Sequence, residues 1–141
     1  MKEDDVLINL DGITFKYLQG PLVLDGLDFK LERGNRVGLI APNGSGKTTL
    51  LHIIMGLLKP LSGKLEIFGK PVREEKDFAA IRRRIGLLFQ DADDQLFSPT
   101  VLEDVAFGPL NLGKSKSEAI HIARHTLDRL GLAGFEDRIT F

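Results

Sequence analysis

The sequence contains no cysteine, which excludes disulfide bonds, thiolate metal sites and cysteine nucleophiles, and which fits an intracellular protein. It also lacks any apolar run near the about 20 residues needed to cross a bilayer. The N-terminal stretch MKEDDVLINL is acidic and too short in apolar residues for a signal peptide. The net charge is only -1, so no global field attracts nucleic acid or an anionic membrane. We therefore expect no nucleic-acid partner, and any membrane span must come from another subunit.

The composition is that of an ordinary globular protein. Hydrophobic residues make up 43% of the 141 residues and charged residues 28%. This length corresponds to one domain or to part of a larger one. We find no internal repeat and no low-complexity segment in the chain.

Two kinds of strand pattern occur before residue 90. Apolar and polar residues alternate at residues 27–32 and again at residues 64–67, as expected of sheets with one buried face. Residues 36–41 (RVGLIA) and 85–90 (IGLLFQ) are instead almost continuously apolar, which predicts strands buried on both faces. Helices are expected at about residues 46–55, closed by a glycine, and at residues 78–84.

The chain after residue 90 is expected to be mostly helical. Thr100 with Glu103, and Ser115 with Glu118, fit the capping box, in which each side chain satisfies a backbone N–H at a helix start. The second box precedes a predicted helix over residues 116–130. Its apolar stripe consists of Ala119, Ile120, Ala123, Leu127 and Leu130.

The stretch IAPNGSGKTTL, residues 40–50, has the features of a phosphate-binding loop. Gly44 and Gly46 allow backbone conformations and close approaches that a Cβ atom would forbid. Successive N–H groups entering a helix N-terminus form an anion site, which the helix dipole strengthens. Lys47 supplies a cation for the outer phosphates, and the Thr48 hydroxyl suits Mg²⁺. A predicted strand, loop and helix follow one another as such a site requires.

Ala41 stands where the phosphate-loop pattern has its first glycine. That position holds the turn and does not touch phosphate directly, so we expect the alanine to be tolerated. The alternative is a glycine-rich turn that carries GKT by chance. The strand expected before the loop and the helix expected after it favour nucleotide binding.

The chain resembles the nucleotide-binding subunits of ABC transporters. The motifs GLIAPNGSGKTTLL and IGLLFQ carry the resemblance, which extends from Val6 to about Arg138. The segment LLFQDADDQLFSPTVLEDVAFGPLNLG, residues 87–113, is similar to the ATPases of cobalt/nickel and energy-coupling-factor importers. The resemblance implies an α/β fold of the P-loop NTPase type. An antiparallel β part and the N-terminal part of the nucleotide-binding core would occupy residues 1–90, and the start of a helical lobe residues 91–141.

The resemblance also implies the roles of individual residues. ATP would contact Tyr17, Asn43, Gly44, Ser45, Gly46, Lys47, Thr48 and Thr49. Tyr17 matches the aromatic residue that stacks on adenine in this family, although a tyrosine at a strand end with its hydroxyl in water is the simpler alternative. Gln90 matches the glutamine that, with Thr48, meets Mg²⁺. Lys47 and Gln90 are the two residues to which the resemblance assigns a catalytic role.

The partners implied are a transmembrane permease subunit and a second ATPase subunit, identical or homologous. The segment from Asp91 to Val105 matches the face that meets the membrane partner, with Leu96, Phe97 and Val101 as candidate contacts. Local packing of a helical lobe is the alternative for each of these side chains. The protein would then lie at the cytoplasmic face of a prokaryotic membrane.

Three further clusters are weaker candidates. His121 and His125 share a helix face with Glu118, but a zinc site needs about four ligands and no other cluster supplies them. Residues 82–84, all arginine, fit a charged helix face better than a phosphate site. The acidic residues Asp93, Asp94, Glu103 and Asp104 are loosely spaced, which favours solvent or a partner surface over a metal site.

Two motifs that ATP hydrolysis requires in this family are not found in the sequence. The glycine-rich signature and the Walker B carboxylates would follow Phe141, and strands that come later in the chain would separate residues 36–41 from residues 85–90. We therefore expect a truncated piece of a longer ATPase with a gap in its sheet, which would expose apolar faces. Copies that exchange elements offer one way to fill that gap.

The complete protein is expected to couple ATP hydrolysis to import of cobalt or nickel ions or of a vitamin. The sequence does not identify the cargo, because other subunits select it. One alternative is a soluble ABC-type ATPase, which would be expected to show a basic surface or an extra domain. The other is a nucleotide-binding or interaction fragment without catalysis.

Overall fold

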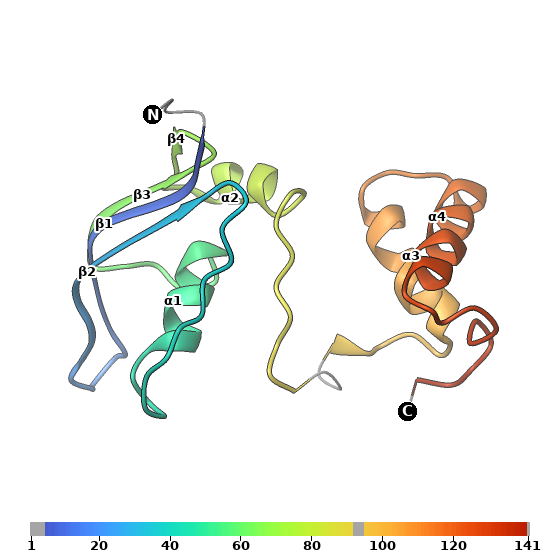
Figure 1. Ribbon diagram of the computed structural model, residues 1–141, viewed down its shortest axis with the longest axis horizontal. Helices are drawn as coiled ribbons and strands as arrows, with labels where there is room; N and C mark the ends of the chain where they lie inside the picture. Colours follow the sequence, from blue (N-terminus) through green and yellow to red (C-terminus); the bar gives the residue numbers. More distant parts are fainter. Residues whose placement is uncertain (1–4, 92–94, 141) are drawn as a thin grey trace. The chain divides into compact units, whose positions relative to one another are not determined.

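The computed structural model describes residues 5–91 and 95–140 (Figure 1). The chain divides into two compact units, Met1–Leu87 and Leu88–Phe141. Within the described residues, no helix has both the length and the apolar character needed to cross a membrane.

The first unit contains a four-stranded antiparallel sheet. Its strands are β1 (Val6–Lys16), β2 (Leu22–Glu32), β3 (Ser62–Ile67) and β4 (Lys70–Pro71), in the order β2-β1-β3-β4 (Figure 1). The alternation predicted in β2 and β3 is confirmed, because their apolar residues face the core while the intervening polar residues are exposed. The sheet thus presents one apolar face for a helix to cover.

Helix α1 (Lys47–Ile54) covers that apolar face, close to the predicted limits of 46–55. Its buried residues Leu50, Ile53 and Ile54 belong to the same core cluster as the inward-facing residues of β1, β2 and β3. Gly56 follows the helix with a φ of 72°, and its N–H donates to the carbonyl of Ile53, as a C-terminal glycine does. The packing of α1 on the sheet therefore fixes where its N-terminus lies.

Helix α2 spans Glu75–Ile81, so the predicted range of 78–84 was wrong at both ends. The helix begins earlier because Glu74 caps it in a capping box with Asp77. The Asp77 carboxylate accepts hydrogen bonds from the backbone N–H groups of Arg73 (3.1 Å) and Glu74 (3.0 Å). These two bonds hold the pKa of Asp77 below its ordinary value.

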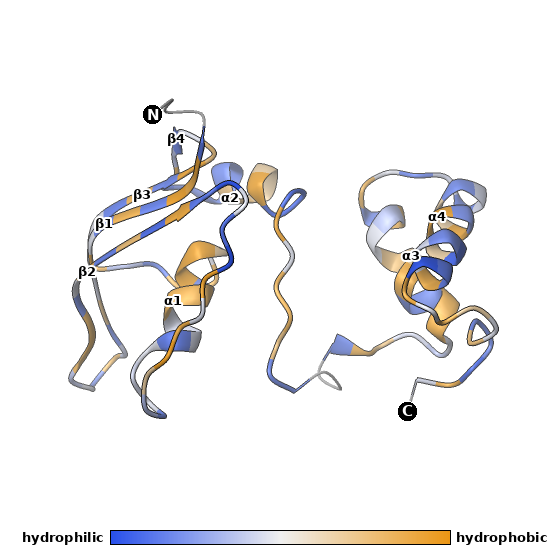
Figure 2. Ribbon diagram, in the orientation of Figure 1, coloured by the Kyte–Doolittle hydropathy of each residue, from blue (hydrophilic) through white to orange (hydrophobic). Residues whose placement is uncertain are grey.

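The two strands predicted at residues 36–41 and 85–90 are not formed. Both runs are mainly hydrophobic (Figure 2), yet Ile40 is 99% exposed and Leu88 is 81% exposed. The physical reason is that an apolar segment becomes a strand only when a neighbouring strand pairs with its backbone. The four strands of the sheet pair only with one another, so neither run is a strand of that sheet.

The second unit is built on a pair of helices, α3 (Val101–Asn111) and α4 (Lys116–Arg129). The cap at Ser115 is confirmed, because its hydroxyl accepts from the N–H of Glu118 (3.3 Å) and the Glu118 carboxylate accepts from the N–H of Ser115 (3.0 Å). The cap at Thr100 is confirmed only in part. The Thr100 hydroxyl accepts from the N–H of Glu103, but the Glu103 carboxylate accepts from that hydroxyl and not from the backbone N–H of Thr100.

The predicted apolar stripe of α4 is correct at its centre. Ala119 and Ala123 are buried against Ala106 of α3, and Leu127 is buried as well. Leu130 is mostly exposed, in contrast to the prediction, because the helix ends at Arg129 and Leu130 is already the cap residue.

Alanine variants of Ile53 and Ile40 form a matched pair that tests whether residues 36–41 are exposed. Ile53 is fully buried, so Ile53→Ala should lower the free energy of unfolding by about 2–5 kcal/mol. Ile40 is almost fully exposed, so Ile40→Ala should change the free energy of unfolding by less than about 0.5 kcal/mol. Urea denaturation of both variants measures the two values. A large loss for Ile40→Ala would mean that residues 36–41 are buried in solution.

The two hydrogen bonds to Asp77 predict an acid-dependent contribution to stability. The native pKa lies below the ordinary value of 3.8, so the stabilisation is fully present above that value and is lost as the pH falls through the lower native pKa. Asp77→Asn does not titrate. The stability difference between wild type and Asp77→Asn, measured by urea denaturation, should therefore be larger at pH 7 than at pH 3. A difference that does not change with pH would contradict this assignment.

Candidate functional site

The glycine-rich loop before α1 requires glycine for two different reasons. Gly44 and Gly46 have φ values of 78° and 92°, in the left-handed region that disfavours a side chain. Only Gly46 is also crowded: a Cβ there would lie 2.9 Å from side-chain atoms of both Val23 and Leu24. Gly46 therefore lets the loop run directly against strand β2, whereas Gly44 only turns the chain.

The N-terminus of α1 is open toward an anion. Its N-cap is Gly46, which has no side chain to accept hydrogen bonds, and its first turn contains no acidic residue. The N–H groups of a first helical turn have no partner within the helix, and the helix dipole makes this end positive. These groups, together with the preceding loop, form a site suited to phosphate oxygens.

The Lys47 side chain bridges two backbone carbonyl groups of the loop. Its Nζ donates hydrogen bonds to the carbonyl oxygens of Ala41 and Pro42, each at 2.8 Å. The N–H of Ser45 also donates to the Pro42 carbonyl, at 3.4 Å. Ala41 thus contributes through its backbone carbonyl, a group that any residue supplies. The ammonium group lies within the turn that leads into α1.

The other predicted loop residues lie in the same place. Asn43, Gly44, Ser45 and Thr48 are exposed, and Lys47 is half-buried. The Thr48 hydroxyl, one residue into α1, is therefore accessible to a divalent cation, and its oxygen is a ligand type that Mg²⁺ accepts. The residues present fit a Mg²⁺–triphosphate group, with Lys47 for charge and Thr48 for the metal.

Tyr17 is connected to this loop by a contact that the sequence did not predict. It follows β1 directly, yet its hydroxyl lies 3.0 Å from the Oγ1 atom of Thr49 on α1, within hydrogen-bond distance. Its ring meets the ring of Phe15 edge to face, with centroids 5.0 Å apart. Nearly half of Tyr17 (49%) is exposed. The hydroxyl of this strand-end tyrosine therefore has a protein partner, and stacking of adenine on its ring stays a prediction.

Gln90 belongs to the second unit, whereas Thr48 belongs to the first. Gln90 is exposed, and the neighbouring N–H of Phe89 donates to the side-chain oxygen of Gln95 at 3.2 Å. A magnesium site shared by Gln90 and Thr48 remains a prediction.

The predicted partner-contacting segment exposes aromatic surface. Leu96 and Phe97 are exposed and Val101 is half-buried. The Phe97 ring packs edge to face on Phe107, with centroids 4.5 Å apart. Phe107 was not predicted as part of this surface, and its position ten residues further along the chain gave no signal for it.

Asp104 organises the same segment. Its carboxylate accepts hydrogen bonds from the backbone N–H groups of Phe97 (3.3 Å) and Ser98 (3.0 Å). Glu103 is engaged in the cap of α3. These hydrogen bonds give Glu103 and Asp104 of the predicted patch structural roles. Asp93 and Asp94 lie outside the described residues.

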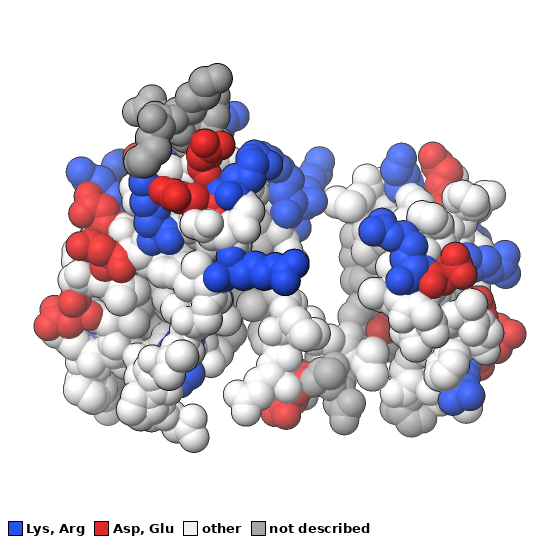
Figure 3. All heavy atoms as spheres, viewed as in Figure 1, with Lys and Arg blue, Asp and Glu red and all other residues white. Residues whose placement is uncertain are grey.

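The remaining candidates are surface features. Arginine and lysine side chains gather in the region of α2 (Figure 3). Arg82 pairs with Glu75, and Arg84 lies 3.6 Å over the ring of Phe68. His121 and His125 are exposed on α4. In the described part of the chain, no group of three or more histidine, cysteine or acidic residues is arranged to hold a metal.

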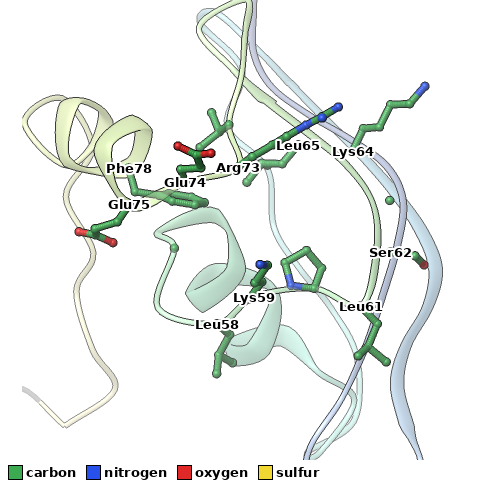
Figure 4. A pocket seen from close by; sticks show the side chains of 14 residues that line it. Leu58, Lys59, Leu61, Ser62, Lys64, Leu65, Arg73, Glu74, Glu75 and Phe78 are labelled. Carbon is green, nitrogen blue, oxygen red and sulfur yellow. The ribbon is translucent and has the colours of Figure 1, made fainter.

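A cavity of about 660 Å³ lies beyond the other end of α1, after Gly56 (Figure 4). Leu58, Leu65 and Phe78 form part of its apolar wall, and Lys59 is among its charged residues. No residue of the glycine-rich loop lines it, so this cavity is separate from the candidate phosphate site.

Comparison with known proteins gives a family match over residues 24–140, to the family described as ABC transporter. A protein of Nitratidesulfovibrio vulgaris, provisionally named an ABC transporter ATP-binding protein, is 56% identical over 95% of the chain and 50% of its own length. The energy-coupling factor transporter ATP-binding protein EcfA of Methanocaldococcus jannaschii is 43% identical over 94% of the chain and 48% of its own length.

Solved structures agree with the sequence matches. The structure of cbiO1 from Clostridium perfringens, described as part of the ABC transporter complex cbiONQ, superimposes with a TM-score of 0.83 at 32% identity. The match covers 96% of this chain and 54% of cbiO1. The chain thus spans about half the length of the relatives it matches.

The two loop glycines give a second matched pair. Gly44→Ala introduces only backbone strain and should cost about 1–2 kcal/mol of unfolding free energy. Gly46→Ala adds the clash with Val23 and Leu24 and should cost clearly more. Chemical denaturation of both variants measures the two losses of unfolding free energy and shows which is larger. Equal losses would show that α1 does not approach β2 as closely as the structure places it.

Proposed function

The chain belongs to the ABC transporter family, and we propose that it provides the ATP-binding part of the energy-coupling subunit of an ABC importer. The observation that carries the proposal is the loop before α1. Its glycine N-cap, its open first turn and the enclosed Lys47 ammonium group converge on one small region. Such a region binds the phosphates of a nucleotide through backbone N–H groups and one cation.

We assign the predicted roles within this site as follows. Lys47 exchanges its bonds to the loop carbonyls for phosphate oxygens and neutralises their charge. The loop residues Asn43, Gly44, Ser45 and Gly46 present their backbone N–H groups, and Thr48 offers a hydroxyl ligand to Mg²⁺. The exposed ring of Tyr17 provides a stacking surface for adenine.

We infer that the complete protein hydrolyses ATP. When bound, Mg²⁺ would neutralise phosphate charge, and Lys47 would hold the outer phosphates in place for attack by water. Gln90 would help to hold the metal and the water. The signature and Walker B motifs that the resemblance requires for hydrolysis are not found among the 141 residues. We therefore expect this chain to bind nucleotide weakly at best and not to turn it over.

The cargo proposal rests on the relatives. Two of them, from Methanocaldococcus jannaschii and Methanothermobacter thermautotrophicus, are named as energy-coupling factor transporter ATP-binding proteins. Together with the resemblance of residues 87–113, these names favour import of cobalt or nickel ions or of a vitamin. A nucleotide-binding fragment without catalysis remains the second candidate function.

The proposed partners are a permease and a second ATPase subunit. Asp104 accepts hydrogen bonds from the N–H groups of Phe97 and Ser98. The exposed Leu96 and Phe97 of this segment provide an apolar surface for a permease segment at the cytoplasmic face of the membrane. Differential affinity of open and closed ATPase dimers for ATP would convert binding into movement of the permease.

Calorimetric titration of the chain with Mg-ATP tests the nucleotide site. Lys47→Ala removes the enclosed cation, so the affinity should fall about tenfold or more. Lys59→Ala is the matched control, because this exposed lysine lies beyond the opposite end of α1 and should leave the affinity unchanged.

Two results would contradict the proposed function. One is an affinity for Mg-ATP that Lys47→Ala and Lys59→Ala reduce equally, since binding would then not involve the loop. The other is the absence of any binding by the wild type. Release of phosphate by the wild-type chain, lost in Lys47→Ala, would instead show that these residues suffice for turnover.

A further inference from the structure

The contact between Tyr17 and Thr49 joins two parts of the first unit that are 32 residues apart. Tyr17 begins the turn between β1 and β2, in which the N–H of Gly20 donates to the Tyr17 carbonyl at 3.0 Å. Thr49 lies on α1, two residues after Lys47 and one after Thr48. The tip of the aromatic ring thus reaches the helix whose N-terminus forms the phosphate site.

Thr49 requires a hydrogen-bond partner more than the other residues of the loop do. Its exposed fraction is 5%, and it is the one buried polar residue identified in the described part of the chain. No buried side-chain oxygen or nitrogen lacks a partner there. The Tyr17 hydroxyl, 3.0 Å away, is the partner of Thr49, so a change that removes either hydroxyl leaves the other without this bond.

Two contacts therefore determine the orientation of the Tyr17 ring. Phe15 packs against it at an interplanar angle of 90°, and Thr49 holds the hydroxyl at the opposite end from the backbone. The remaining half-exposed surface is the part open to a planar ligand. A ring held in this way loses little rotational freedom when a base stacks on it.

We propose that Thr49 is a positioning residue for base recognition, acting through the Tyr17 hydroxyl. Because Thr49, Lys47 and Thr48 lie on one helix, the bond places the stacking surface in a fixed position relative to the phosphate site. The spacing between base and triphosphate is then set by α1 and not by the β1–β2 turn alone. This inference rests on the proposed nucleotide-binding function.

The proposal assigns a role to the hydroxyl of Tyr17 that stacking alone does not require. Phenylalanine stacks as well as tyrosine, so Tyr17→Phe would be neutral if the ring acted only by its face. If the hydrogen bond positions the ring, Tyr17→Phe weakens binding of ligands that carry a base. It leaves unchanged the binding of inorganic tripolyphosphate, which lacks a base.

The experiment measures the affinities of Mg-ATP and of magnesium tripolyphosphate for the 141-residue chain and compares their ratio. Tyr17→Phe should lower the ratio about fivefold, the size expected for one neutral hydrogen bond. Thr49→Val removes the bond from the other side and should lower the ratio by the same factor. Thr49 also belongs to the predicted phosphate contacts, and use of the ratio cancels the loss that both ligands share.

Three further variants complete the test. Tyr17→Phe combined with Thr49→Val should lower the ratio no further than either change alone. Thr49→Ser keeps the hydroxyl and should give the same affinity ratio as the wild type. Thr126→Val is the matched control, because this threonine of α4 donates its hydroxyl to the carbonyl of Ile122 within its own helix.

The chain also provides a direct probe of the ring. Tyr17 is its single tyrosine and the chain has no tryptophan, so ¹³C-labelled tyrosine yields one set of resonances. Mg-ATP should shift the ring resonances, whereas magnesium tripolyphosphate should leave them close to their starting positions. Equal shifts with both ligands would contradict stacking of the base on Tyr17.

The outcomes separate this inference from the proposed function. An unchanged ratio in Tyr17→Phe or in Thr49→Val would overturn the inference while leaving nucleotide binding intact. A double variant with a ratio lowered by the product of the two single effects would overturn it as well, because the two residues would then act independently. If the wild type bound neither ligand, the proposed function would fail, and the inference with it.

Discussion

The close approach of Gly46 to β2 is the constraint on which the candidate site depends. A single methyl group at this position would lie within 2.9 Å of Val23 and Leu24, so α1 reaches its place on the sheet only with glycine there. Once the helix is seated, Leu50, Ile53 and Ile54 enter the core. Burial of these side chains provides the free energy that holds the helix N-terminus and the preceding loop in one position.

Helix α1 connects the functional features of the first unit. At its start, Lys47 bonds the carbonyls of Ala41 and Pro42 and so gathers the loop around a positive charge. One and two residues later, Thr48 is exposed and Thr49 holds the hydroxyl of Tyr17. The Lys47 ammonium group, the proposed metal ligand and the proposed stacking surface are thus attached to one packed helix. This attachment keeps the candidate site in one position although most of its residues lie in loops.

The apolar runs at residues 36–41 and 85–90 show where composition is an incomplete guide. Their continuous hydrophobicity predicts strands buried on both faces, but hydrophobicity does not supply the backbone partners that a strand needs. The four strands that form are joined by short connections or pair antiparallel with β1, and each finds its partner within the chain. Ile40 and Leu88 are therefore exposed, and the sheet with a gap between two formed strands, which the sequence predicted, is not what these residues adopt.

Features governed by short-range interactions could be read from the order of amino acids. The glycine-rich loop and its helix, the cap at Ser115 and the alternation in β2 and β3 depend on residues within a few positions of one another. The bond between Tyr17 and Thr49 and the packing of Phe97 on Phe107 do not. They exist only because folding brings separate elements together, and side-chain spacing along the chain carries no signal for such a meeting. Tertiary structure therefore decided which side chains surround the glycine-rich loop, and which apolar segments joined the sheet.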